Sequence, residues 1–127
     1  MQNFQARKQQ SPVEGWDHQD PEEAFTLPSR YFYDETLFKA ERDNIFMHAW
    51  HVAGHVSEFA EPGQYVVTDL FDQSVVVAKN RQGQIHGFHN VCQHRGNRLL
   101  EERRGTTGGV VRCAYHSWCY EMDGTLR

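Results

Sequence analysis

Two short motifs in the chain, Cys92-x-His94 and Cys113-x-x-His116, bring together side chains that bind metals. Thiolates and neutral imidazoles both ligate transition metals, and two of each make a four-ligand set. Each motif carries one cysteine followed by one histidine, whereas the short pairs of a zinc finger are Cys–Cys and His–His. This order favours a [2Fe-2S] cluster in which two histidines replace two cysteines on one of the irons.

The electrostatics of this ligand set indicate electron transfer. Two ferric ions and two sulfides sum to about +2, so two thiolates and two neutral imidazoles leave the oxidised cluster neutral. An added electron then meets less repulsion than in a four-cysteine cluster, and the potential rises from about −400 mV to between about −150 and +300 mV. A structural zinc site is the alternative, because two cysteines and two histidines also satisfy tetrahedral zinc.

The composition fits one domain with a modest core. The 127 residues are 39% hydrophobic and 13% aromatic, which leaves room for one domain and an extended leader. No apolar run approaches the ~20 residues of a membrane span, and the polar N-terminus does not resemble a signal peptide. Two of the three cysteines lie in the motifs, and the unpaired Cys119 fits a reducing compartment. We therefore expect a cytoplasmic protein without a membrane contact.

Charge is distributed unevenly along the chain. Residues 1–72 contain 13 acidic and 5 basic residues, whereas residues 73–127 contain 4 acidic and 8 basic ones. The arginines near the two motifs are Arg95, Arg98, Arg103, Arg104 and Arg112. They form either a docking face for an acidic electron donor or an ordinary solvated surface. No motif indicates nucleic-acid binding.

The segments before the motifs divide into an arm and a leader. Residues 1–30 are polar, acidic and proline-punctuated, so we expect an extended arm, in which Trp16 and Phe25 could anchor to a neighbouring subunit. Residues 31–49 form the leader region. A helix is expected over 34–49, with Asp34 as its N-cap. The residues that gather on its apolar side are Leu37, Phe38, Ile45, Phe46 and Ala49.

The remainder predicts a mainly β domain over 50–127. The expected strands are Trp50–Val56, Gln64–Leu70, Ser74–Lys79, Gln84–Asn90, Gly109–Arg112 and Trp118–Glu121. Turns are expected at Glu61–Gly63, Asn80–Gly83, Gly105–Gly108 and Asp123-Gly124. Short, closely spaced strands favour an antiparallel β-sandwich or barrel, with the two motifs at the tips of two hairpins.

With these residues in view, the chain resembles the α subunit of Rieske non-haem iron oxygenases, the aromatic-ring-hydroxylating family, over about residues 27–127. The similar segments are Leu27-Pro28, Leu37-Phe38 to Ile45-Phe46, Trp50, Gly54-His55, residues 61–65, 90–96, 113–118 and 123–126. His94-Arg95-Gly96 after the first cysteine and Trp118 after the second histidine make the resemblance more specific than four ligands alone.

The resemblance implies a Rieske-type antiparallel β-sandwich with a small cluster-binding subdomain of two hairpin loops, preceded by one N-terminal helix. It also implies a division of labour between the ligands. Cys92 and Cys113 would hold the inner iron, and His94 and His116 the outer iron of a Rieske [2Fe-2S] cluster. Arg95, Tyr115 and Trp118 would support it from outside the ligand set. Electrons would come from a reductase or ferredoxin and pass to a mononuclear iron held by two histidines and a carboxylate, which activates O2.

The family also implies an oxidoreductase, either dioxygenase or monooxygenase, that assembles as a homotrimer. We expect this chain to be truncated at its C-terminus, without the catalytic iron domain and so without catalytic residues of its own. A stand-alone Rieske ferredoxin is the alternative, although such proteins lack the leader. Respiratory Rieske proteins add a disulfide-forming cysteine to each loop, and Asn97 and Tyr115 occupy those places here. Two departures from the family pattern fall in the second loop, at Ala114 (usually Pro) and Ser117 (usually Gly).

Several other residues invite a metal-site interpretation. His48, His51 and His55 have helical spacing, but the strand expected over 50–56 argues against a shared site. His89 lies near the first loop and is a candidate for its surroundings. Cys119 is expected to be a buried small hydrophobic residue.

Overall fold

The computed structural model describes residue 22 and residues 26–127, so the predictions for Trp16 and Phe25 lie outside the described residues. The described residues divide into two units, one that ends at Trp50 and one over residues 51–127. Each unit is described by itself.

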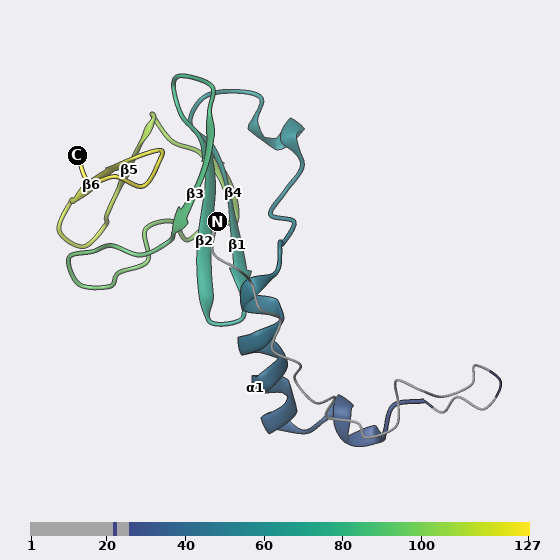
Figure 1. Cartoon of the computed structure of the whole chain (residues 1–127). Helices are drawn as coiled ribbons and strands as arrows, with labels where there is room; N and C mark the ends of the chain where they lie inside the picture. Colours follow the sequence, from purple (N-terminus) through teal and green to yellow (C-terminus); the bar gives the residue numbers. More distant parts are fainter. Residues whose placement is uncertain (1–21, 23–25) are drawn as a thin grey trace, which may run out of the picture. The chain divides into compact units, whose positions relative to one another are not determined.

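The described part of the first unit contains one α-helix between two 3-10 turns. The elements are η2 (Ser29–Phe32), α1 (Glu35–Asn44) and η3 (Phe46–His48) (Figure 1). Asp34 caps α1 as predicted, because its Oδ1 accepts hydrogen bonds from the backbone N–H of Thr36 at 2.8 Å and of Leu37 at 3.2 Å. The helix ends at Asn44, sooner than the predicted residue 49. Asn44 Nδ2 donates to the carbonyl of Ala40 (2.7 Å), and the chain then tightens into η3.

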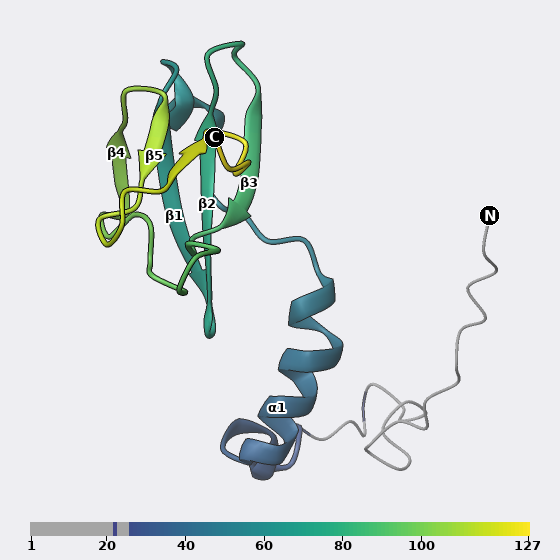
Figure 2. The same cartoon turned by 90° about the vertical axis from the view of Figure 1, so that its left-hand side faces the viewer.

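The second unit is built on a four-stranded antiparallel sheet in the order β3-β2-β1-β4 (Figure 2). The strands are β1 (Gln64–Leu70), β2 (Gln73–Lys79), β3 (Ile85–His89) and β4 (Arg104–Thr106). β1 and β2 pair from Tyr65 opposite Ala78 to Leu70 opposite Gln73, across a two-residue turn. Consecutive valines, Val66 and Val67 in β1 and residues 75–77 in β2, supply the β-branched side chains that such a pleated surface favours.

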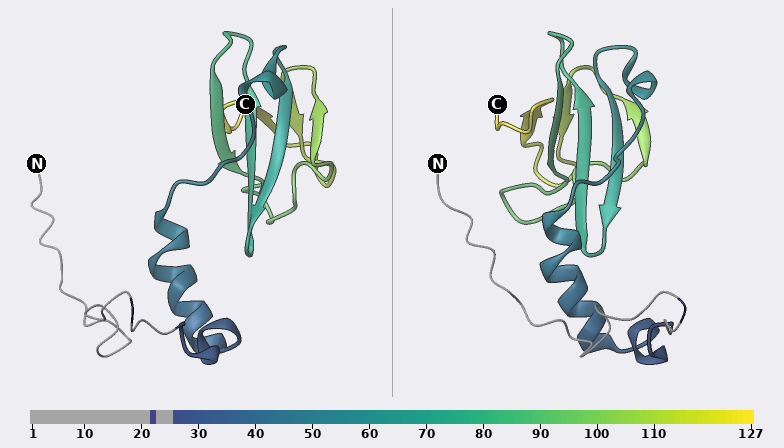
Figure 3. Two further views of the ribbon diagram at one scale, coloured as in Figure 1. Left: turned by 90° about the vertical axis from the view of Figure 1, so that its right-hand side faces the viewer. Right: turned by 45° about the vertical axis from the view of Figure 1, so that its right-hand side comes forward.

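A second sheet, the hairpin of β5 (Val110–Arg112) and β6 (Cys119–Glu121), lies over one face of the first (Figures 1 and 2). The hydrophobic core lies between them. Its buried members are Tyr65, Val67, Val76, Ala78, Cys92, Leu99, Val111, Cys113, Tyr120 and Met122. On the opposite face of β1, Val66 is buried near the segment that leads into η4 (Val56–Phe59), and η4 contacts β1 (Figure 3). The antiparallel, mainly β fold with one α-helix is as predicted.

Two predicted elements are wrong. No strand forms over Trp50–Val56; the segment is irregular and ends in η4, where His55 Nδ1 accepts a hydrogen bond from the Ser57 N–H at 3.2 Å. Residues 105 and 106 belong to strand β4, so the turn predicted at 105–108 does not begin where expected. A Cβ on Gly105 would lie 2.6 Å from the Tyr65 hydroxyl, so this glycine permits close packing of β4 on β1 and does not mark a turn.

Candidate metal centre

Two loops at the same end of the second unit carry the predicted ligands (Figures 1 and 2). Both loops are closed by the same pattern of backbone hydrogen bonds, which we call the loop frame. In the first loop, the Cys92 N–H donates to the carbonyl of Asn97 (2.7 Å), and the Gly96 N–H donates to the carbonyl of Cys92 (2.9 Å). In the second, the Cys113 N–H donates to Trp118 (2.8 Å), and the Ser117 N–H to Cys113 (3.0 Å). Each frame therefore closes at the fourth and fifth residues after its cysteine.

The fourth position of each frame takes a left-handed backbone. Gly96 has φ +70°, and Ser117 at the matching place has φ +61°. Glycine adopts this conformation at no steric cost, whereas serine is strained there. The histidines occupy different places, His94 two residues after its cysteine and His116 three residues after. The two loops therefore have the same backbone hydrogen bonds but carry their imidazoles at different positions along the loop.

The two thiols are buried side by side. Cys92 and Cys113 are each 2% exposed. Tyr120 Oη donates a hydrogen bond to Cys92 Sγ (3.2 Å) and accepts one from the Gln93 N–H (2.9 Å). The Tyr120 hydrogen bond is the largest cause that lowers the pKa of Cys92; the backbone N–H groups of His94 and Arg95 and the Cys113 thiol act in the same direction, against burial. This environment favours the thiolate that a metal requires.

Burial raises the pKa of Tyr120, and its hydrogen bond to Cys92 raises it further. The phenol therefore keeps its proton and remains a donor at neutral pH. Tyr120 was not among the residues singled out in the sequence, and it lies 28 residues from Cys92 in the chain. The signal that could have found it is the alternation of β6, which points Tyr120 into the core.

The two imidazoles lie at the surface, next to each other. The His94 and His116 rings are both exposed, with their centroids 4.8 Å apart at an interplanar angle of 71°. Trp118 stacks on the His94 ring at 4.8 Å and 9°, and the exposed Tyr115 ring contacts His116 at 3.8 Å. Both aromatic side chains therefore restrict the orientation of an imidazole.

This donor arrangement fits a [2Fe-2S] cluster. A mixed-ligand [2Fe-2S] cluster needs a pair of thiolates for one iron and a pair of imidazoles for the other. Cys92 with Cys113, and His94 with His116, could supply these two pairs.

The structure also places the other residues singled out in the sequence. Cys119 is only half-buried, and its thiol donates to the carbonyl of Ser117 (3.3 Å), so the prediction of a fully buried residue is wrong. The His55 ring is held by its contact with Ser57 Oγ (2.8 Å). Arg95 and His89 are exposed.

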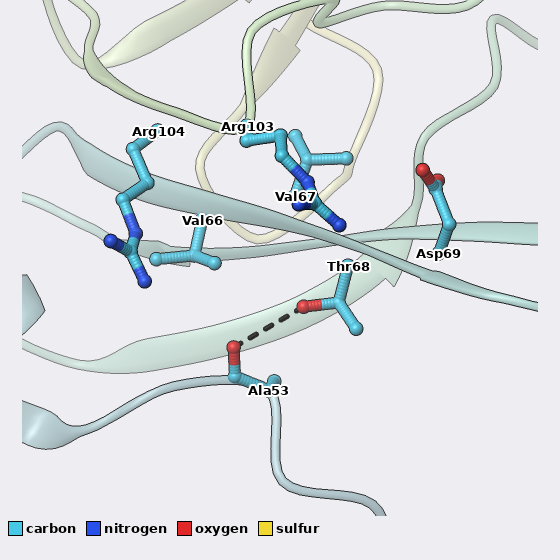
Figure 4. A pocket seen from close by; sticks show the side chains of 7 residues that line it. All are labelled: Ala53, Val66, Val67, Thr68, Asp69, Arg103 and Arg104. Atoms are coloured by element: carbon cyan, nitrogen blue, oxygen red, sulfur yellow. Dashed lines mark hydrogen bonds between the residues drawn. The ribbon is translucent and has the colours of Figure 1, made fainter.

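The described residues also form a cavity of about 330 Å³ along β1, shown in Figure 4. Its lining residues are Ala53, Val66, Val67, Thr68, Asp69, Arg103 and Arg104. Thr68 Oγ1 donates to the carbonyl of Ala53 across it (3.2 Å). None of the four predicted ligands lines this cavity.

No helix in the described part of the chain is long and apolar enough to cross a membrane.

Comparisons with known proteins identify relatives over most of the chain. The chain is 36% identical over 107 residues to the carnitine monooxygenase oxygenase subunit of Escherichia coli K12, a match that covers 84% of this chain and 28% of the relative. It is 38% identical over 103 residues to the glycine betaine monooxygenase oxygenase subunit of Pseudomonas aeruginosa, covering 81% and 24%. The chain thus spans about a quarter of the length of these relatives.

Solved structures give the same result. A quaternary ammonium Rieske monooxygenase matches with a TM-score of 0.78 and 32% identity, over 82% of this chain and 28% of that one. Naphthalene 1,2-dioxygenase from a Rhodococcus species matches with a TM-score of 0.74 and 36% identity, over 79% and 22%. The family model for the Rieske [2Fe-2S] domain matches residues 49–127. The chain therefore belongs to the Rieske [2Fe-2S] domain family.

Proposed function

We propose that this chain is the electron-relay part of a Rieske-type oxygenase. In this proposal Cys92 and Cys113 hold one iron of the [2Fe-2S] cluster, and His94 and His116 hold the other. The observation that carries the proposal is the pairing of two buried thiols with two exposed imidazoles, on two loops that have the same backbone hydrogen bonds. When bound, the cluster takes electrons from a reductase or ferredoxin and supplies them to a mononuclear non-haem iron that activates O2.

The surrounding residues have separate tasks in this relay. Burial of the two thiols excludes water from the sulfur side, while the exposed imidazoles give electrons a route through the surface. The Tyr120 hydroxyl stabilises negative charge on Cys92 Sγ. The Trp118 ring fixes the plane of His94. Arg95 and Tyr115, also on the loop tips, belong in our proposal to the same supporting set.

The leader favours an oxygenase over a stand-alone ferredoxin. The match to the carnitine monooxygenase subunit leaves only 20 of the 127 residues unmatched, so it includes residues 29–50. The leader and the Rieske domain thus occur together in a much longer oxygenase subunit. We propose the domain organisation of an arm (1–30), a leader (31–49) and a Rieske domain (50–127). We further propose a cytoplasmic homotrimer with electron transfer between subunits. Inter-subunit electron transfer is described for the quaternary ammonium monooxygenase.

The cluster assignment is tested by spectroscopy on the purified chain. We expect a brown protein that contains iron and acid-labile sulfide in equal amounts and, when reduced, gives the low-g rhombic electron paramagnetic resonance (EPR) signal of a Rieske cluster. Cys92→Ser should abolish cluster assembly. A colourless protein that binds zinc instead of iron would contradict the proposal.

The relay role is tested by kinetics. Stopped-flow mixing of the oxidised protein with a reduced ferredoxin or an NADH-linked reductase should bleach the visible absorption of the cluster within the turnover time of such oxygenases. A cluster that only small chemical reductants can reduce would exclude a relay between proteins.

A further inference from the structure

We propose that Asn90 is a positioning residue that closes the base of the first ligand loop and holds Cys92 and His94 in place for the cluster. The proposal rests on the proposed function, because it concerns the ligands of the same centre. It assigns a task to a side chain outside the four-ligand set.

The two loops differ at their bases, although their tips share one frame. The second loop is the tip of the β5–β6 hairpin, and its base is closed by the strand pair Arg112 and Cys119. The first loop has no such strand pair. The chain leaves β3 at His89 through a tight turn, in which the Val91 N–H donates to the carbonyl of His89 (2.8 Å), and the returning segment meets it only at the isolated bridge between Val91 and Arg98.

The Asn90 side chain supplies the missing base. Its Oδ1 accepts hydrogen bonds from the backbone N–H groups of Leu99 (3.2 Å) and Leu100 (2.9 Å). Its Nδ2 donates to the carbonyl of Leu100 (2.8 Å) and to Ser74 Oγ (3.2 Å). The amide thus makes with Leu100 the same pair of hydrogen bonds that a neighbouring strand would make, and it ties both to the start of β2.

Burial makes this contact difficult to replace. Asn90 is 3% exposed, and in the part of the chain that the structure describes it is the one polar residue classed as buried. All four hydrogen-bonding positions of its amide are occupied, and water cannot substitute for them without entry into the core. Leu99 beside it is buried in the same core as Cys92. The base of the loop is therefore fixed to the sheet through one side chain.

The contacts continue from this base to the ligands. Above Asn90 come the bridge between Val91 and Arg98 and then the hydrogen bond from the Cys92 N–H to the carbonyl of Asn97. Loss of the lowest contact frees the returning segment, so the Cys92–Asn97 closure has to hold the loop alone. The second loop has its own strand pair and keeps its geometry. Asn90 therefore controls the position of Cys92 and His94 relative to Cys113 and His116.

The test compares Asn90→Ala with Phe59→Ala in the purified protein. Phe59 is a buried residue (4% exposed) in η4 and is not a member of the core that contains the two ligand cysteines, so its truncation should destabilise the domain at another place. Hydrogen exchange measured by mass spectrometry should accelerate about tenfold for peptides that contain Leu99 and Leu100 in Asn90→Ala only. Release of iron to a chelator should also be about tenfold faster in Asn90→Ala than in the control at equal distance from the unfolding midpoint. The reduced EPR signal should broaden in Asn90→Ala alone.

Asn90→Asp is the second variant, used if Asn90→Ala does not fold. It keeps an acceptor for the leucine amides but places a carboxyl oxygen where Nδ2 donates to the Leu100 carbonyl, so we expect exchange at Leu100 and iron release to be faster than in the wild type and in Phe59→Ala. Equal iron release from the Asn90 and Phe59 variants, with unchanged exchange at Leu99 and Leu100, would overturn the proposal. The exchange measurement requires no cluster, so failure of the wild-type chain to bind one would contradict the proposed function and leave the exchange result to decide the role of Asn90.

Discussion

Replacement of Tyr120 by phenylalanine removes one hydroxyl from the buried side of the centre. That hydroxyl donates to Cys92 Sγ (3.2 Å) and accepts from the Gln93 N–H (2.9 Å). A hydrogen bond to a charged acceptor contributes about 1.5–3 kcal/mol, and it is stronger for the reduced cluster, which carries one more negative charge. If about 1 kcal/mol of it distinguishes the two redox states, the potential falls by about 40 mV, since 59 mV corresponds to about 1.4 kcal/mol for one electron.

The assay is an equilibrium redox titration followed by EPR or circular dichroism. Tyr115→Phe is the matched control, because it removes the same hydroxyl from a tyrosine whose side chain is exposed and which contacts His116 through its ring. We expect Tyr120→Phe to lower the potential by about 40 mV and to cost about 1 kcal/mol of unfolding free energy through the unpaired Gln93 N–H. A potential that is unchanged or higher in Tyr120→Phe, or that falls equally in both variants, would refute the reasoning.

Three further predictions concern strain, pH and ligand type. Ser117→Gly should relieve the left-handed backbone at φ +61° and raise the free energy of unfolding by about 0.5–1 kcal/mol in a urea titration. Gly96→Ser, at the matching position and with no atom within 4 Å of the added Cβ, should lower it by about 1 kcal/mol; equal effects of the same sign would contradict the strain argument. Hydrogen bonds from Thr125 lower the pKa of Asp123, so the contribution of this carboxylate to stability is complete above its unfolded pKa of about 4 and is lost as the pH falls through its folded pKa. The urea midpoint should therefore fall on acidification below about pH 4, and Thr125→Val should reduce that fall. His116→Cys should lower the cluster potential markedly if any cluster assembles, because a thiolate adds negative charge to the centre; an unchanged potential would contradict ligation by His116.

The sequence predicts the sheet well where alternation and turn residues agree. β1 has its predicted bounds, and β2, β3, β5 and β6 differ by a single residue at one end or at both. The alternating apolar residues of Trp50–Val56 fail as a predictor, because a strand also needs a partner, and the contact of Ala53 with this sheet is to the Thr68 side chain. The sequence predicts a turn and not strand β4 at Gly105, because the role of this glycine depends on the Tyr65 ring across the sheet.

The centre is predicted less completely than its ligands. The four candidate ligands stand out by type and spacing, and the structure brings the cysteines together and the histidines together. Tyr120 and Asn90 act through contacts with residues distant in sequence, which a single sequence does not display. Long-range hydrogen bonds of this kind depend on how strands pack, and spacing along the chain carries no record of them.

The common frame of the two loops has a consequence for protein engineering. Its closing hydrogen bonds join backbone atoms only, so the side chain that follows each cysteine, Gln93 or Ala114, is free to vary. The frame asks of its sequence chiefly a residue at its fourth position that tolerates a left-handed backbone. Such a loop is a portable module: grafted onto the tip of another antiparallel hairpin, with glycine at that position, it should present a cysteine inward and a histidine outward on a new scaffold.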